Sequence, residues 1–143
     1  MRIIDTSVLL PAVNPSLPQH DPARMALEGA INDERPLGLT WVVVNAFLRL
    51  TTKPGLFEHP LTIEQAWDLM NDWLAHPGVR VVQETEEHPR LWSELLRSAG
   101  TGGDLTTDAW IAAIALAHGA SVLTLDSDFA RFAGVRWESP LER

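Results

Sequence analysis

The stretch TTDAWIAAIALAHGASVLTLDSDF, residues 106–129, joins an apolar helix pattern, a glycine stop and an apolar strand pattern that runs into two acids. Gly119 is typical of the position just after a helix, and the apolar run beyond it has the length of a buried strand. Asp108 lies in the first turn of the predicted helix, and Asp126 and Asp128 follow the predicted strand. A cap or a turn explains the presence of any one of these acids, but it explains the presence of all three less easily.

The composition is typical of one soluble globular domain. The 143 residues are 45% hydrophobic and 21% charged, and a chain of this length buries a substantial core. No apolar run is long enough to cross a bilayer, and Asp5 interrupts the apolar N-terminal residues before they form a signal peptide. The absence of cysteine excludes disulfides and is compatible with a reducing compartment. We therefore expect residues 1–143 to form a single cytoplasmic domain with no membrane contact.

The charge balance limits the kinds of partner. A net charge of −8 and a pI near 5.0 argue against a protein that coats nucleic acid nonspecifically, because neutralising phosphates requires lysine and arginine. An acidic protein can still act on a polyanion if bound cations offset its acids, and its charge also suits a basic partner. The five histidines are scattered, with no pair at the helical spacing of a zinc site.

Short apolar strands alternate with helices along the rest of the chain. Asp21 and Pro22 look like an N-cap and the first helical residue, and Thr62 with Gln65 forms a capping-box pattern. The predicted elements are strands at 2–4, 79–82 and 135–137, a helical segment at 6–10, and helices at 21–31, 62–74 and 89–98. This alternation predicts an α/β fold with a mainly parallel central sheet.

The segment TWVVVNAFLRL, residues 40–50, fits two kinds of element. Its three consecutive valines, 42–44, favour a strand, whereas Trp41, Val44 and Leu48 fit one face of a helix. We interpret the segment as a helix.

Three acids that are distant in the sequence are expected to meet at one edge of the sheet. Asp5 and Asp126 each follow a predicted strand, and ligands of open α/β sheets bind at the carboxyl ends of parallel strands. Asp108 begins the helix that leads into the Asp126 strand. Because a crossover helix runs antiparallel to the strands it joins, its N-terminus lies at that same edge.

Each acid also has a purely structural explanation. The helix dipole favours an acid in a first turn, which explains Asp108 as well as a ligand role does. Asp104 is interpreted as a cap or loop acid. For Asp126 the structural alternative is a role in a turn, and for Asp128 it is capping of the short turn that follows. Asp5 is the hardest to explain in this way, because a charged residue after so short a buried strand needs a partner.

Several carboxylates at one edge repel each other unless a cation offsets their charge. No histidine or lysine lies close to these acids in the sequence. A hard divalent ion, Mg²⁺ or Mn²⁺, takes oxygen ligands and keeps several waters. Such an ion orients a phosphodiester, activates water and stabilises the leaving oxygen. The acids therefore suggest metal-assisted hydrolysis of a phosphodiester.

Three motifs resemble those of a known family. IIDTSVLL (3–10), TTDAWIAAIA (106–115) and VLTLDSDFARF (122–132) have the order and separations found in PIN-domain nucleases, specifically the VapC-type toxins of bacterial VapBC toxin–antitoxin pairs. The resemblance covers essentially the whole chain. It implies a PIN-like three-layer α/β/α sandwich, a Mg²⁺-dependent endoribonuclease that also accepts Mn²⁺, a homodimer, an RNA substrate and a cognate VapB-type antitoxin.

The resemblance also assigns roles by motif position. Asp5 corresponds to the family's first metal acid, and Asp108 to the acid that the second metal shares. Asp126 corresponds to the acid of the TxDxDF motif, with Asp128 beside it as an outer contributor to the metal site. The resemblance thus implies catalytic roles for Asp5, Asp108 and Asp126, and metal binding by all four acids.

One position departs from the family pattern. The family usually has a Glu five residues beyond a Ser or Thr in this region, and counting from Thr40 that position holds Asn45. An amide oxygen can ligate a metal or a bound water but contributes no charge. The resemblance therefore implies a weaker metal affinity, unless Asp104 or Asp128 compensates.

Asn45 and Arg49 are the candidate substrate-binding residues. If the 40–51 helix continues slightly, Asn45, Arg49 and Lys53 fall on one face at helical spacing. Arg49 would then hold a phosphate near the acids. The alternative is a solvated or salt-bridged arginine.

Three other functions fit parts of the sequence. A phosphatase or phosphotransferase with Asp5 as nucleophile would be expected to carry a second Asp where Ser7 stands. AGTGGD, residues 99–104, is rich in glycine but lacks the lysine of a P-loop and does not follow a strand. The most serious alternative is a PIN domain that is catalytically weakened by Asn45 and acts mainly through protein or RNA binding.

Overall fold

Five short strands form one parallel sheet in the computed structural model, which describes residues 1–141. The strand order across the sheet is β3-β2-β1-β4-β5. The strands are β1 (Arg2–Ile4), β2 (Leu37–Leu39), β3 (Val79–Val81), β4 (Ser121–Leu123) and β5 (Trp137–Glu138). Because every pairing is parallel, all of the strands present their carboxyl ends at the same edge of the sheet.

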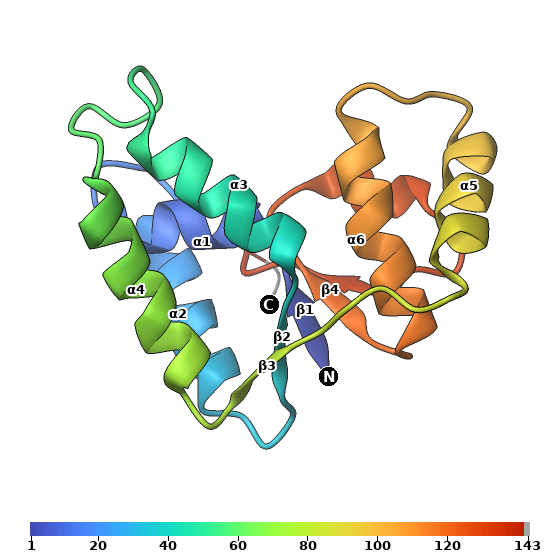
Figure 1. The fold of residues 1–143 in the computed structure, drawn as a ribbon, viewed down its shortest axis with the longest axis horizontal. Coiled ribbons are helices and arrows are strands. Elements are labelled where there is room, and N and C mark those ends of the chain that lie inside the picture. Colours follow the sequence, from blue (N-terminus) through green and yellow to red (C-terminus); the bar gives the residue numbers. More distant parts are fainter. Residues whose placement is uncertain (142–143) are drawn as a thin grey trace.

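Helices cover both faces of this sheet. They are α1 (Thr6–Ala12), α2 (His20–Ile31), α3 (Trp41–Thr52), α4 (Ile63–Ala75), α5 (His88–Ala99), α6 (Leu105–Ala117) and the 3₁₀ helix η1 (Ser127–Arg131). Helices α1 to α4 lie on one side of the strands, and α5 and α6 lie on the other (Figure 1). The chain is therefore a three-layer α/β/α sandwich with a parallel central sheet, which confirms the predicted fold class.

Helix α6 lies between α5 and the strands, and its sequence explains why. It is apolar on every side, and each residue from 111 to 115 is buried. A helix without a polar face is stable only when it is enclosed. It packs against α5 on one side and against β4 and β1 on the other. Burial of α6 holds its N-terminal turn, which carries Asp108, at a fixed place beside the sheet.

Strand β2 was not predicted from the sequence. It contains only three residues, and the central one is Gly38, which is unfavourable for a strand. Close packing requires this glycine: a Cβ atom at Gly38 would lie 2.8 Å from Val82 Cγ2 and 3.1 Å from Ile3 Cγ1. The residue that weakens the strand signal in the sequence is thus the one that lets the sheet pack tightly.

Several predicted elements are confirmed. The ambiguous segment is helix α3, and the strand alternative is wrong. The capping box opens α4, since Gln65 N donates to Thr62 Oγ1 at 3.1 Å and Thr62 N donates to Gln65 Oε1 at 2.9 Å. Helix α5 ends at Gly100, whose positive φ of 74° suits glycine.

Some predicted boundaries are wrong. Helix α2 begins at His20 rather than after Asp21, because the chain already turns there and His20 N donates to Leu17 O. The strand that was predicted to run up to Asp126 is β4, which ends at Leu123. The N–H of Leu125 donates to Ser7 Oγ and not to a neighbouring strand.

The last strand was predicted at 135–137 but spans Trp137–Glu138. Val135 instead closes a turn, in which its N–H donates to Phe132 O. Helix α3 ends at Thr52, so Lys53 follows the helix in an extended conformation and does not continue the helical face.

Individual tryptophans differ in how they are packed. Trp73 packs edge-on against Phe47, with ring centroids 5.2 Å apart, and belongs to the packing of α3 on α4. Trp41 and Trp67, in contrast, are 48% and 39% exposed. Among residues 1–141, no helix combines the length and apolar character needed to span a membrane.

Candidate functional site

Strands β1 and β4 bring Asp5 to the carboxyl edge of the sheet. The two strands pair in parallel with Ile4 opposite Leu123, and Asp5 N continues the ladder by donating to Leu123 O at 2.9 Å. The following residue, Thr6, begins α1. Asp5 is only 5% exposed, so its carboxyl group must find partners inside the protein.

Two hydroxyl groups hold the Asp5 carboxyl. Ser7 Oγ and Thr124 Oγ1 each donate to Asp5 Oδ2 at 2.7 Å, and the two hydroxyl oxygens lie 3.1 Å apart. Each hydroxyl also accepts a backbone N–H from the loop after β4. Leu125 N donates to Ser7 Oγ and Asp126 N donates to Thr124 Oγ1, both at 2.9 Å. The network therefore ties Asp5 to the loop that carries Asp126.

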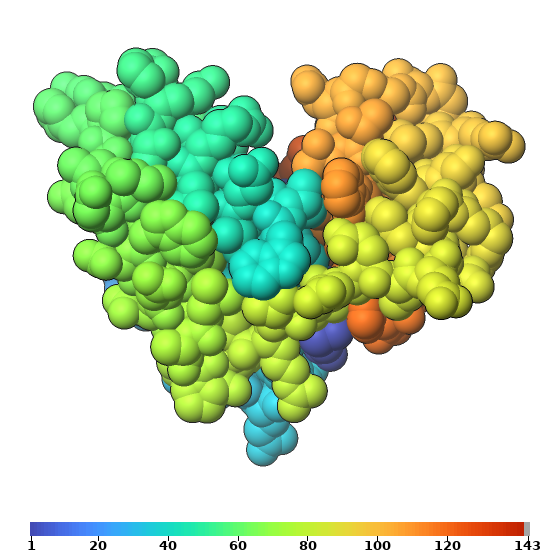
Figure 2. Space-filling model, in the orientation of Figure 1, coloured from blue at the N-terminus to red at the C-terminus, as the bar shows by residue number. Residues whose placement is uncertain are grey.

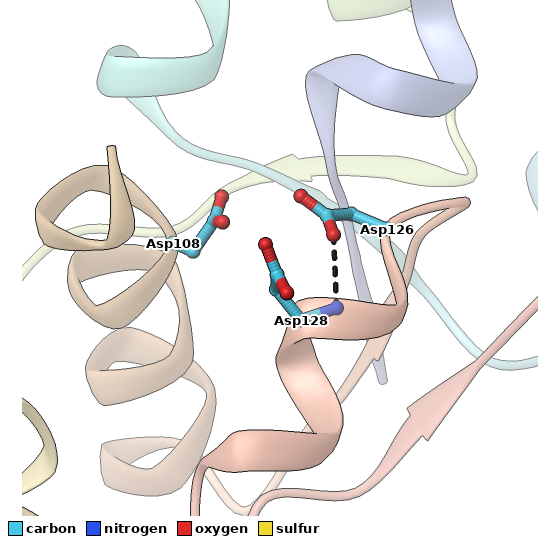
Figure 3. Close-up of side chains that lie close together, drawn as sticks. All are labelled: Asp108, Asp126 and Asp128. Carbon is cyan, nitrogen blue, oxygen red and sulfur yellow. Dashed lines mark hydrogen bonds between the residues drawn. The ribbon is translucent and has the colours of Figure 1, made fainter. Parts of the chain in front are cut away.

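Asp126 is the N-cap of η1. Its Oδ1 accepts the backbone N–H of Asp128 at 2.9 Å, the bond drawn in Figure 3. The expectation that Asp128 caps this turn is wrong, because the cap is Asp126 and Asp128 lies in the first turn of η1. One carboxylate oxygen of Asp126 is thus used for capping, and the tight turn brings the Asp128 side chain beside it.

Helix α6 adds Asp108 to these two acids. Figure 3 shows the Asp108 side chain extending from α6 toward Asp126 and Asp128. One carboxylate oxygen from each of the three lies within 4.8 Å of the others. We call Asp108, Asp126 and Asp128 the outer acid group. Asp104 takes the N-cap position of α6 without a side-chain capping bond and is exposed.

Burial and mutual repulsion perturb the acids. The pKa of Asp108 is raised to about 7, first by burial and then by the charges of Asp5 and Asp126. The pKa of Asp5 is also raised, chiefly because burial penalises its charge, although the hydroxyls of Ser7 and Thr124 act in the opposite direction. Within residues 1–141, no salt bridge joins these acids to a basic side chain. The site therefore carries excess negative charge that a cation would neutralise.

The four predicted acids do not all lie in one close group. Asp5 lies close enough to affect the pKa of Asp108 but stands apart from the outer acid group. The Asp128 carboxylate lies close to those of Asp108 and Asp126, and its predicted role as an outer contributor to a metal site stays a prediction.

The molecular surface is hollowed between two groups of helices (Figure 2). Figure 2 shows this hollow between the teal and green segments, which include α3 and α4, and the yellow and orange segments, which include α5 and α6. Asn45 and Arg49 are exposed, on the opposite side of α3 from residues that pack against α1 and α4. In the described part of the chain neither side chain makes a hydrogen bond or ion pair with the protein, so the salt-bridged alternative for Arg49 is not observed.

Sequence reasoning missed the role of two residues. From the sequence, Ser7 served only to argue against a phosphatase, and Thr124 belonged to the TxDxDF motif without a role of its own. Both lie in short patterns, Asp-x-Ser and Thr-x-Asp, whose hydroxyl groups are suited to hold a neighbouring carboxylate. The missing information was the register of β1 on β4, which places Thr124 next to Asp5.

The nucleotide-binding alternative is not supported. Residues 99–104 join α5 to α6, two helices, and do not follow a strand as a P-loop does. The phosphatase alternative also loses support. Such an enzyme would be expected to carry a second acid at position 7, whereas Ser7 is a hydroxyl residue that donates a hydrogen bond to Asp5.

Comparison with known proteins identifies relatives along the whole chain. The PIN domain model matches residues 2–135. Ribonuclease VapC37 of Mycobacterium tuberculosis is 44% identical over 140 residues, covering 98% of this chain and 97% of that protein. Ribonuclease VapC33 of the same species is 34% identical over 141 residues and covers 99% of both chains.

Solved structures share the fold. VapBC2 from Rickettsia felis bound to a promoter DNA fragment aligns with a TM-score of 0.70 and 17% identity, covering 96% of this chain and 97% of that chain. M. tuberculosis VapC20, described as a sarcin-ricin loop cleaving toxin, aligns with a TM-score of 0.69 and 18% identity, covering 95% and 99%.

Proposed function

The chain belongs to the PIN-domain family and is a relative of the VapC ribonucleases, and from this premise we propose that it is a Mg²⁺-dependent endoribonuclease and the toxin of a type II toxin–antitoxin pair. One observation carries the proposal: three carboxylates converge at the carboxyl edge of the sheet in a chain that is 44% identical to a ribonuclease along its length. In this proposal residues 1–143 act as one PIN domain.

The donor set suits a hard divalent cation. The outer acid group offers three carboxylate oxygens within 4.8 Å of one another, and Mg²⁺ and Mn²⁺ prefer oxygen ligands. Burial raises the pKa of Asp108 most, and the nearby negative charges of Asp5 and Asp126 raise it further. We propose that Asp5, Asp108, Asp126 and Asp128 hold the cation, with Asp5 on its buried side. A bound Mg²⁺ supplies Lewis-acid chemistry, which orients the phosphodiester and favours loss of a proton from water.

The protein residues around the cation site are arranged in advance. Ser7 and Thr124 fix Asp5 Oδ2, and the Asp128 N–H fixes Asp126 Oδ1. Groups held in place before the substrate arrives need not reorganise during the reaction. We propose catalytic roles for Asp5, Asp108 and Asp126 on this basis.

Asn45 and Arg49 are proposed to contact the substrate. Both are exposed on α3, which borders the hollow seen in Figure 2. An arginine without a carboxylate partner in residues 1–141 is available to bind a phosphate. Asn45 adds no negative charge to the site. The second candidate function is therefore a PIN domain whose catalysis is weakened and which acts mainly by binding protein or RNA.

The proposed partners follow from the relatives. Several structures with this fold are complexes named VapBC, and we propose that this chain likewise binds a VapB-type antitoxin in the cytoplasm and forms a homodimer. A net charge of −8 and an acidic site favour an antitoxin segment that places a basic side chain near the acids.

A cleavage assay with one matched control tests the function. Purified protein is incubated with structured RNA in Mg²⁺ or Mn²⁺, in EDTA, and as the variants Asp108→Asn and Asp104→Asn. We expect cleavage by the wild type and by Asp104→Asn, which removes an equal charge from the same helix end outside the outer acid group. We expect none with Asp108→Asn or EDTA. Metal-dependent RNA binding without cleavage would support the weakened domain, and cleavage in EDTA would contradict the metal site.

A further inference from the structure

We propose that the exposed side of α3 is a binding site for single-stranded RNA, in which Trp41 stacks on a base and Arg49 contacts a phosphate. We define the α3 stripe as Trp41, Asn45 and Arg49. The inference rests on the proposed nuclease function and adds to it the path that the substrate takes and the residue that reads a base.

The three residues of the stripe share one side of α3. They are spaced four residues apart, so they follow one another along the helix surface, and all three are exposed. The buried residues of α3 lie on the other side, toward α1 and α4, and are Val43, Val44, Phe47 and Thr51. Packing within the described chain therefore accounts for one side of α3 and leaves the stripe without a partner.

Trp41 is the unusual member of the stripe. It is 48% exposed, and in residues 1–141 it pairs with no other aromatic ring. Trp73, by comparison, packs against Phe47. An indole ring presented to solvent offers an apolar face on which any nucleic-acid base can stack.

The charge around the stripe favours a polyanion. No Asp or Glu occurs from Arg35 to Phe57, although the whole chain has a net charge of −8. Arg49 and Lys53 form no salt bridge in the described chain, whereas Arg2, Arg24 and Arg90 all do. The stripe and the residue just beyond it thus combine an aromatic ring with unpaired cations, the combination by which proteins bind single-stranded nucleic acid.

The sheet places the stripe next to the acids. Strand β2 pairs with β1 so that Ile3 lies opposite Gly38, and two residues further along this register puts Thr40 beside Asp5. Trp41 follows Thr40 directly and begins α3. Trp41 is thus the stripe residue nearest this edge along α3, and an RNA strand bound along the stripe would run from Arg49 toward the acids. Helix α3 also borders the hollow seen in Figure 2.

Binding of a single-stranded 2′-O-methyl RNA, which lacks the free 2′-hydroxyl, tests the stripe by fluorescence anisotropy at several salt concentrations. We expect Trp41→Ala to weaken binding about tenfold, since stacking on one base is lost, with little change in salt dependence. Arg49→Gln should weaken binding and reduce the slope of log K against log salt by about 0.7, the contribution of one phosphate contact. Trp41→Phe should restore part of the affinity.

Two matched variants serve as controls. Trp67→Ala removes a tryptophan of similar exposure from α4, and Arg24→Gln removes an exposed cation from α2. Neither should change the affinity or the salt slope. Circular dichroism establishes that each variant is folded.

Three outcomes would overturn the inference. The first is wild-type RNA affinity in Trp41→Ala, and the second is an equal loss of RNA affinity in Trp41→Ala and Trp67→Ala. The third is conversion of a dimer to a monomer by Trp41→Ala with unchanged RNA affinity, which would make the stripe a contact between two copies of the chain. Cleavage of unmodified RNA by the wild type, measured in parallel, separates failure of this inference from failure of the proposed function.

Discussion

Asp5 and the outer acid group lie at the same edge of the sheet, but the protein treats their charges differently. Asp5 is buried, and two hydroxyl groups donate to its carboxyl oxygen. In the outer acid group, the backbone N–H of Asp128 donates a hydrogen bond to the Asp126 carboxylate. The pKa of Asp108 in the same group is raised to about 7, first by burial and then by the neighbouring acids. The protein itself provides hydrogen-bond donors for Asp5, whereas within residues 1–141 no basic side chain forms a salt bridge with the outer acid group.

The largest effect that we expect in this comparison is the loss of RNA cleavage in Asp5→Asn, a variant that removes the charge of Asp5 but keeps its shape. In Asp5→Asn the amide oxygen can still accept from Ser7 and Thr124, so we expect the melting temperature to change little. The negative charge behind the cation is lost, and RNA cleavage should fall roughly 1,000-fold. Cleavage rates measured with circular dichroism melts check this expectation, and a fully active Asp5→Asn would remove Asp5 from the mechanism.

The hydroxyl network can be tested at Thr124. Thr124→Val keeps the shape of the side chain but removes the donor to Asp5 and the acceptor for Asp126 N. We expect cleavage and metal affinity to fall about 10- to 100-fold, as for other groups that orient metal ligands. Thr124→Ser keeps the hydroxyl and should retain most of both. Equal losses in the two variants would mean that Thr124 matters only for packing.

Asn45 offers the reverse experiment, in which charge is added. Asn45→Glu places a carboxylate on the exposed side of α3, at the position where the family usually has one. If this side chain reaches the cation, metal binding should tighten about tenfold. Titration calorimetry measures the change, and weaker or unchanged binding would show that α3 does not contribute to the metal site here.

The smallest expected effect concerns stability without metal. The pKa of Asp108 is about 7 in the folded protein, against 3.8 for an ordinary Asp. The folded state therefore holds this proton more tightly than the unfolded chain, and the resulting stability, complete below pH 4, is lost as the pH rises through 7.

The variant Asp108→Asn removes this pH dependence. At pH 8 in EDTA we expect it to melt about 5 °C higher than the wild type, with little difference at pH 4. Melting curves at the two pH values provide the test. A lower melting temperature at pH 8 would show that repulsion among the acids does not destabilise the metal-free protein.

The residue pattern predicted a parallel α/β fold and the convergence of the acids because both follow from topology, and the resemblance to PIN-domain nucleases added the three-layer sandwich. Helix α6 is apolar beyond its first turn and β4 follows it closely, so burial and the parallel crossover determine where Asp108 and Asp126 lie. Strand β2 escaped prediction because three residues centred on Gly38 carry almost no strand signal. Its requirement for glycine becomes visible only when Val82 and Ile3 are in place.

The details of the site depended on information that local patterns lack. The hydrogen bond from Thr124 to Asp5 joins residues that are 119 positions apart, and it follows from strand register. Whether Asp126 or Asp128 caps η1 depends on the backbone angles at the turn, and both residues are acceptable caps. Residue types therefore indicated the chemistry, and the arrangement of the acids required the folded chain.

Mg²⁺ titration of the wild type, Asp108→Asn and Asp104→Asn at pH 7.5, followed by calorimetry without RNA, tests the central claim most directly. Saturable binding should occur in the wild type and in Asp104→Asn, and should be lost or much weakened in Asp108→Asn. Equal binding by all three proteins, or none by the wild type, would contradict the account of the outer acid group as a cation site.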